Sequence, residues 1–217
     1  MRAVIFANGI MDVWPLEFNL SVEDDLIIAA DGGYNHCKRW DLKPHVLVGD
    51  MDSVADSDLS ALEKTSTQIL RYPAQKDETD LQLAIQTAVD RHATDIIILG
   101  ALGSRWDMTL SNVLILTIPL LQNVDARILD GPDEIICLQG PGKSQLNGDI
   151  GHLLSLIPLS GPAIGVTLAG TAYMLDKATL PMGTSRGISN VFRKKRVTIE
   201  IESGQLLVVI SREGSAT

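Results

Sequence analysis

Two aspartates, Asp50 and Asp52, stand one residue apart directly after a short apolar run. The run at residues 46–48 is rich in valine and predicts a buried strand that ends at Gly49. Open α/β sheets bind their ligands at the carboxyl ends of their strands. Two carboxylates at such an edge repel each other unless a cation lies between them, and Mg²⁺ is the usual cation. The alternative is a solvated turn in which the aspartates only help to form the turn.

Other polar residues and glycines follow the ends of further predicted strands. They are Asn8, Gly9, Asp31, Gly32, Gly33, Asp77, Asp80 and Gly100. Asp77 and Asp80 stand three residues apart at a helix start, which places both on one face of the first turn. Up to five carboxylates therefore converge on one rim, and this predicts Mg²⁺ carrying a polyphosphate. The glycines allow backbone N–H groups to approach phosphate closely.

Arg105 lies in the loop after the fifth predicted strand. Its guanidinium can make a bidentate contact with the same phosphate. Asp107 follows two residues later, where it either orients Arg105 or caps the next helix.

Alternating strands and helices must position these residues. Strands are predicted at residues 3–7, 26–30, 45–48, 68–72, 95–99 and 126–129. Helices are predicted at residues 34–40, at 56–64 with Asp56 or Ser57 as cap, and at 107–121. The clearest helix carries Leu81, Ala84, Ile85 and Ala88 on one face and begins at Thr79 or Asp80. This alternation predicts an α/β fold with an N-terminal parallel-sheet, Rossmann-like domain over residues 1–131.

The pattern changes after residue 131. Short apolar runs without helical period follow at residues 134–138, 152–157, 164–168, 197–201 and 206–210. Ser203 and Gly204 predict a tight hairpin between the last two runs. Residues 132–217 are therefore predicted to form a small all-β sandwich domain.

Composition limits the classes of function. The chain has 217 residues, a net charge of −9 and a pI of about 4.8, which argues against nucleic-acid binding because that needs basic patches. Cys37 and Cys137 lack metal-ligand spacing and are expected to be free thiols of a reducing compartment. No signal segment or membrane-spanning run is visible, so we expect a cytoplasmic protein without a membrane partner.

Two other sequence patterns resemble functional motifs, but we do not interpret them as a phosphate-binding loop or as catalytic histidines. Residues 140–144, Gly-Pro-Gly-Lys-Ser, resemble the end of a P-loop, but that motif needs glycine where Cys137 stands and a helix afterwards. We interpret the stretch as a hairpin turn. The histidines lack a partner motif for nucleophilic catalysis and are expected to be structural or exposed; they are His36, His45, His92 and His152.

Several motifs, in order along nearly the whole chain, resemble those of the thiamine pyrophosphokinase (thiamine diphosphokinase) family. They are Asp31-Gly32-Gly33, Gly49-Asp50-Met51-Asp52-Ser53, Lys76-Asp77-Glu78-Thr79-Asp80, and the segments at residues 100–107, 170–175 and 183–192. Each motif is weak alone, and their order and spacing make the resemblance specific.

The resemblance implies transfer of pyrophosphate from ATP to the hydroxyl of thiamine, giving thiamine diphosphate and AMP. It implies Mg²⁺ on Asp50, Asp52 and Asp80, with Asp77 nearby and Arg105 as a further catalytic residue. ATP would be bound by Asn8, Gly9, Asp31, Gly32, Gly33, Arg105 and Asp107. Thiamine would be bound by Ser185, Ser189, Asn190 and Phe192 at the interface of a homodimer.

The sequence departs from the family pattern at two positions. Met108 stands where bacterial members commonly have histidine, and Phe192 stands where some have tryptophan, although either aromatic could stack on thiamine. One alternative is a pyrophosphokinase acting on another hydroxymethyl heterocycle, such as a pterin, and residues 185–192 favour thiamine over it. The other is a catalytically silent nucleotide or thiamine sensor, which would not need an acidic cluster.

Overall fold

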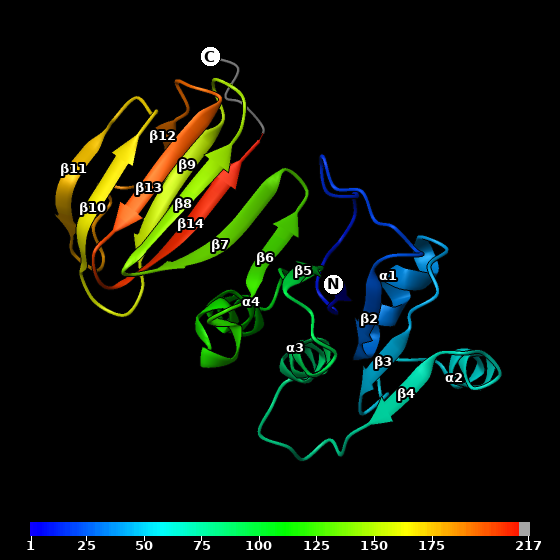
Figure 1. Ribbon diagram of the computed structural model, residues 1–217. Coiled ribbons are helices and arrows are strands. Elements are labelled where there is room, and N and C mark those ends of the chain that lie inside the picture. The colour runs from blue at the N-terminus through cyan, green and yellow to red at the C-terminus, as the bar shows by residue number, and fades with distance from the viewer. Residues whose placement is uncertain (213–217) are drawn as a thin grey trace. The chain divides into compact units, whose positions relative to one another are not determined.

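The chain consists of two compact units, Met1–Gly131 and Pro132–Thr217. The computed structural model describes residues 1–212, so the last five residues of the second unit lie outside the described part (Figure 1). Within residues 1–212, no helix is both long enough and apolar enough to cross a membrane.

A parallel six-stranded sheet forms the centre of the first unit. Its strands are β1 (Arg2–Phe6), β2 (Leu26–Ala30), β3 (Val46–Gly49), β4 (Gln68–Arg71), β5 (Asp95–Leu99) and β6 (Asp125–Asp130). They lie in the order β6-β5-β1-β2-β3-β4, and every neighbouring pair is parallel. All six carboxyl ends therefore share one edge, as the sequence predicts.

Helices cover both faces of this sheet. They are α1 (Tyr34–Arg39), α2 (Asp56–Leu62), α3 (Asp80–Asp90) and α4 (Trp106–Leu114). Side chains of α1 and α2 share one buried cluster with alternate residues of β1, β2 and β3. Helix α3 packs on β1, β2 and β3 from the opposite face (Figure 1). With both faces covered, the central strands are almost wholly apolar.

Helix ends agree with the sequence only in part. Thr79 caps α3, because its side-chain oxygen accepts a hydrogen bond from the Gln82 N–H at 3.3 Å. The predicted cap of α2 is wrong, since the helix starts after Ala55 without a side-chain cap. The predicted helix over 107–121 is also too long. It ends at Leu114, and two 3₁₀ turns follow, at Ile115–Thr117 and Pro119–Leu121, because proline cannot continue an α-helix.

Two antiparallel sheets form the second unit. Strands β7 (Asp133–Gln139), β9 (Leu153–Pro158), β12 (Asn190–Val191) and β14 (Gln205–Ser211) pair in the order β12-β9-β14-β7. Strands β8 (Gly142–Asn147), β10 (Ala163–Ala169), β11 (Leu175–Leu180) and β13 (Arg196–Ile201) pair in the order β11-β10-β13-β8. Buried side chains of both sheets form one core, which makes this unit a sandwich.

Both predicted hairpins are corrected by the strand pairing. Strands β13 and β14 flank Ser203-Gly204 but belong to different sheets, and the same holds for β7 and β8 around residues 140–141. The two turns lie side by side, with the Gly140 N–H donating to the Gly204 carbonyl at 2.9 Å. The Gly-Pro-Gly-Lys-Ser stretch leads into a strand and not into a helix, so it is no P-loop.

Asp25 ties the turn before β2 to the first residue of β1. Its carboxylate accepts bonds from Arg2 Nε at 2.8 Å, from Arg2 Nη2 at 2.6 Å and from the Ser21 N–H at 2.8 Å. Burial raises the pKa of Asp25, but the bonds from Arg2 and Ser21 outweigh that effect and hold the pKa below its ordinary value.

We expect Asp25→Asn to destabilise the chain by about 1–3 kcal/mol at pH 7, because the bonds to a charged acceptor are lost. A lowered pKa contributes stability above the unfolded-state pKa of ~3.9, and the contribution disappears as the pH falls through the folded-state value. The variant should therefore lose less stability on acidification than the wild type. Urea unfolding at pH 7 and pH 3 measures this. The exposed neighbour Asp24→Asn is the control, and an equal effect there would contradict the assignment.

Candidate active site

A cavity of about 400 Å³ lies at the carboxyl edge of the parallel sheet. Its wall comes from the segments that follow β1, β2, β3, β4 and β5, together with the start of α3 and the first turns of α4. The lining residues that sequence analysis also selected are Asn8, Gly9, Asp31, Asp50, Asp80 and Arg105. The fold thus gathers residues from five separate parts of the first unit around one space.

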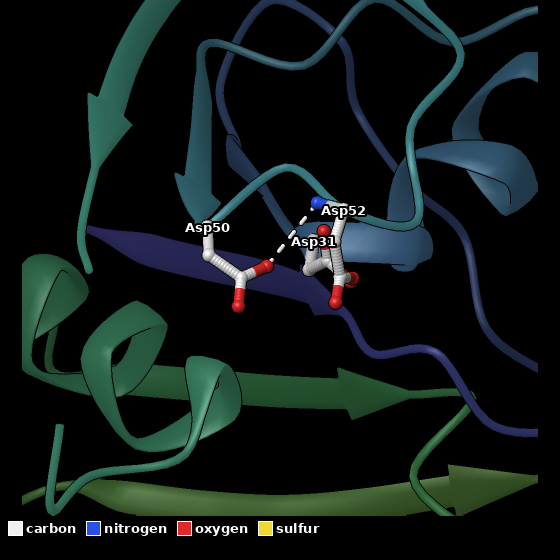
Figure 2. Close-up of side chains that lie close together, drawn as sticks. All are labelled: Asp31, Asp50 and Asp52. Atoms are coloured by element: carbon white, nitrogen blue, oxygen red, sulfur yellow. Dashed lines mark hydrogen bonds between the residues drawn. The ribbon is translucent and has the colours of Figure 1, made fainter. Parts of the chain in front are cut away.

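Three carboxylates converge beside this cavity. Asp31, Asp50 and Asp52 each offer an oxygen, and these oxygens lie within 4.8 Å of one another (Figure 2). The Asp52 N–H donates to Asp50 Oδ1 at 3.2 Å, and the Ser53 N–H donates to Asp31 Oδ1 at 3.4 Å. The turn after β3 thereby uses its own backbone donors to hold the carboxylates together.

Gly49 lets a fourth carboxylate approach the same place. Its φ of +147° is unfavourable for residues with a side chain. A Cβ at this position would lie 2.9 Å from Asp31 Cβ and 3.1 Å from Asp80 Oδ1. Glycine at the end of β3 is therefore what allows Asp80, at the start of α3, to stand next to Asp31.

Lys76 is a cation inside this acidic group. Its Nζ lies 3.1 Å from Asp80 Oδ1 and 4.0 Å from Asp50 Oδ2, and the side chain is only 11% exposed. The contact with Asp80 is an ion pair, and the buried Asp80 Oδ1 has no other partner among residues 1–212. Burial raises the pKa of Asp80; Lys76 opposes this rise, and the charges of Asp31 and Asp50 add to it.

The donor set suits a hard divalent cation, because carboxylate oxygens are the ligands that Mg²⁺ prefers. The carboxylates that converge are Asp31, Asp50 and Asp52, whereas the sequence-derived metal set was Asp50, Asp52 and Asp80. Asp80 lies outside this trio and is paired with Lys76. Asp77 is exposed and does not line the cavity. The metal assignment itself stays a prediction.

Arg105 lines the cavity and is held by Asp107. Arg105 Nη2 lies 2.5 Å from Asp107 Oδ2, and the pairing keeps the pKa of Asp107 below its ordinary value. Arg105 is itself the N-cap residue of α4, so Asp107 lies inside the first turn and orients Arg105 instead of capping the helix. Met108 also lines the wall, where it presents a thioether in place of an ionisable group.

Two contacts shape the rim of the cavity, one between Asn8 and Gly32 and one between His36 and Gly9. The Asn8 side chain lies against Gly32 so closely that an added Cβ would be 2.3 Å from it. His36 Nε2 donates to the Gly9 carbonyl at 2.9 Å. His36 is structural, as expected, but its bond fixes a residue of the cavity wall. Its sequence position gave no sign of this role, because the two residues are far apart along the chain.

The four candidate residues of the second unit differ in accessibility. Ser185 and Ser189 are exposed. Asn190 is buried, and its amide bonds the backbone of Tyr173 in both directions, at 3.0 Å from the Tyr173 N–H and 2.6 Å to the Tyr173 carbonyl. Phe192 is 0% exposed and packs in the sandwich core against His152. No ring face of Phe192 is accessible, so this side chain is not available for the expected stacking on thiamine.

Comparison with known proteins assigns the two parts of the chain. Residues 19–128 match the family model described as thiamin pyrophosphokinase, catalytic domain, and residues 143–206 match thiamin pyrophosphokinase, vitamin B1 binding domain. The chain therefore belongs to the thiamin pyrophosphokinase family.

Similar proteins extend over nearly the whole chain. Thiamine pyrophosphokinase of Bacillus subtilis is 29% identical over 210 residues, covering 96% of this chain and 98% of that protein. Its crystal structure superposes with a TM-score of 0.86, at 26% identity over 98% of this chain and 100% of that one. A thiamin pyrophosphokinase family protein from Enterococcus faecalis has the same TM-score at 28% identity, again over 98% and 100%.

The crowding at Gly49 can be separated from its backbone strain. We expect Gly49→Ala to destabilise the chain by about 1–3 kcal/mol, because the new methyl group meets Asp31 and Asp80 in addition to the unfavourable φ. Gly161 has a similar φ of +135° but no atom within 4 Å of an added Cβ, so Gly161→Ala measures the strain alone. Denaturant unfolding compares the two. Equal losses of stability would show that Gly49 does not control the approach of Asp31 and Asp80.

Proposed function

We propose that this chain transfers the pyrophosphate group of ATP to the hydroxyl of thiamine, giving thiamine diphosphate and AMP. The carboxylate cluster at the edge of the cavity carries the proposal, because it lies in the part of the chain that matches the catalytic-domain model. Family membership indicates which two substrates react, and we propose that the nucleotide binds in the cavity.

In the proposed reaction the thiamine hydroxyl oxygen attacks the β-phosphorus of ATP. The bond from that phosphorus to the oxygen bridging the α- and β-phosphates breaks, and AMP leaves. Mg²⁺ held by Asp50, Asp52 and Asp80, with Asp31 beside them, would supply neutralisation of the phosphate charge. An aspartate of the same cluster accepts the hydroxyl proton. The work of the protein is to position the two substrates and to balance charge.

The remaining cavity residues orient the nucleotide. Arg105, held in place by Asp107, presents its guanidinium to the polyphosphate from the cavity wall. Asn8 and Gly9 lie at the end of β1 in the same wall, where side-chain amide and backbone groups can bind the nucleotide. Asp31, Gly32 and Gly33 also belong to the proposed nucleotide site, where the absence of a side chain at Gly32 lets Asn8 pack closely.

Thiamine is favoured over a pterin by the match of residues 143–206 to a vitamin B1 binding domain. We propose that Ser185 and Ser189 contact thiamine directly, since both are exposed. Asn190 acts indirectly, by holding the backbone of Tyr173. An acidic cluster also speaks against a silent sensor, because a sensor has no need for mutually repelling carboxylates.

A homodimer with thiamine at its interface is part of the proposal. Large apolar side chains are exposed in the second unit, within the segments at residues 170–175 and 182–192; they are Tyr173, Met174, Met182 and Ile188. Such side chains are typical of surfaces covered by a partner. Because the reaction consumes ATP and both cysteines are free thiols, we place it in the cytoplasm.

Removing charge from the cluster tests the proposed activity. We expect Asp50→Asn and Asp52→Asn each to reduce AMP release in the presence of thiamine by roughly a hundredfold or more at saturating Mg²⁺, with the fold intact by circular dichroism. Asp56→Asn, an exposed acid in α2, is the matched control and should keep full activity. Near wild-type turnover in either cluster variant would contradict the metal assignment. Release of AMP with a hydroxymethyl pterin but not with thiamine would contradict the substrate.

Assembly is tested by mass. We expect multi-angle light scattering to give twice the chain mass of 23.5 kDa, because a second copy would cover the exposed apolar side chains of the second unit. Replacing Met174 and Met182 with lysine should shift the protein toward monomer and weaken the apparent affinity for thiamine. The reference variant carries Val22→Lys, an exposed apolar residue of the first unit. A fully active monomer at assay concentration would contradict an interface site.

A further inference from the structure

The ammonium of Lys76 lies among the carboxylates at the carboxyl edge of the sheet. Its Nζ lies 3.1 Å from Asp80 Oδ1 and 4.0 Å from Asp50 Oδ2, and Asp80 Oδ1 is a buried oxygen with no other partner in the described part of the chain. We propose that Lys76 is the internal counter-cation of the metal-free site, and that a divalent cation binds by displacing its ammonium from Asp80.

The charge balance of the cavity supports this role. The acidic side chains at and beside the cavity are Asp31, Asp50, Asp52, Glu78 and Asp80. Lys76 and Arg105 are the cations among the described residues of the wall, and Arg105 is already paired with Asp107. Lys76 is therefore the cation left to offset the repulsion within the cluster.

The attachment of Lys76 makes displacement possible. Its Nζ also donates to the Pro73 carbonyl at 3.2 Å, and residues 72–79 form an irregular segment between β4 and α3. The ammonium thus keeps a backbone partner when it moves away from Asp80. Asp80, by contrast, is fixed in the first turn of α3. A divalent cation that binds Asp80 must compete with the tethered ammonium of Lys76, and this competition lowers the affinity of the site for metal. When no metal is bound, the same ammonium offsets the repulsion between the carboxylates.

The inference rests on the proposed function only in that these carboxylates bind a divalent cation. It is tested with Mn²⁺ alone, without nucleotide or thiamine, by isothermal titration calorimetry on the full chain. We expect Lys76→Met to bind Mn²⁺ about tenfold more tightly than the wild type, because a competing positive charge is gone. Lys76→Arg keeps the charge and should bind Mn²⁺ as the wild type does.

Lys38→Met is the matched control. Lys38 pairs with Asp58 at 2.9 Å and does not line the cavity, so its loss makes the same change in net charge without touching the cluster. Thermal unfolding supplies a second measurement. Metal-free Lys76→Met should melt below the wild type, and saturating Mn²⁺ should raise its melting temperature more than it raises that of the wild type.

The outcomes separate the inference from the proposed function. Equal or weaker Mn²⁺ affinity in Lys76→Met, or an equal gain in Lys38→Met, would overturn the counter-cation role and leave the metal site standing. An absence of Mn²⁺ binding in both wild type and Lys76→Met would overturn the inference and the metal site together.

Discussion

Repulsion between carboxylates is the constraint on which the first unit depends. Asp31, Asp50 and Asp52 meet after the ends of β2 and β3, and Asp80 joins them from the start of α3. Like charges at a partly buried edge cost folding free energy. Backbone N–H groups of the turn after β3 and the ammonium of Lys76 offset part of this cost. The apolar strands, buried on both faces by helices, supply the stability that holds the charges in place.

The same arrangement separates chemistry from support. The candidate site residues lie on turns and helix starts at one edge, while β2 and β3, which precede them, are buried. In the second unit, exposed residues and residues that support the fold alternate along the segment 189–192. Ser189 is exposed, Asn190 fixes the backbone of Tyr173, and Phe192 packs in the core. A motif of consecutive residues therefore mixes surface, positioning and packing roles.

Sequence patterns predicted the parallel sheet well because apolar strands and glycine-terminated ends are local signals. Convergence of Asp31 with Asp50 and Asp52 then followed from the shared edge of parallel strands. Pairing partners did not follow, since Ser203 and Gly204 specify a tight turn but not whether the strands around it bond each other. Strand β8 was missed because five of its six residues are glycine or polar, and only Leu146 is buried. Lys76 stands four residues before Asp80, but its place between two carboxylates depends on how the segment after β4 folds.

Strand β4 is the outermost strand of the parallel order in the first unit, and its composition has a consequence for behaviour at high concentration. Gln68 and Arg71 at its two ends are exposed, Arg71 pairs with Glu63, and Pro73 follows shortly after. An open edge of this kind is where foreign strands can add and start aggregates. A border that is short, charged and followed by proline gives an incoming strand few apolar contacts to gain. The folded enzyme is thereby protected at this edge against growth into open-ended polymers.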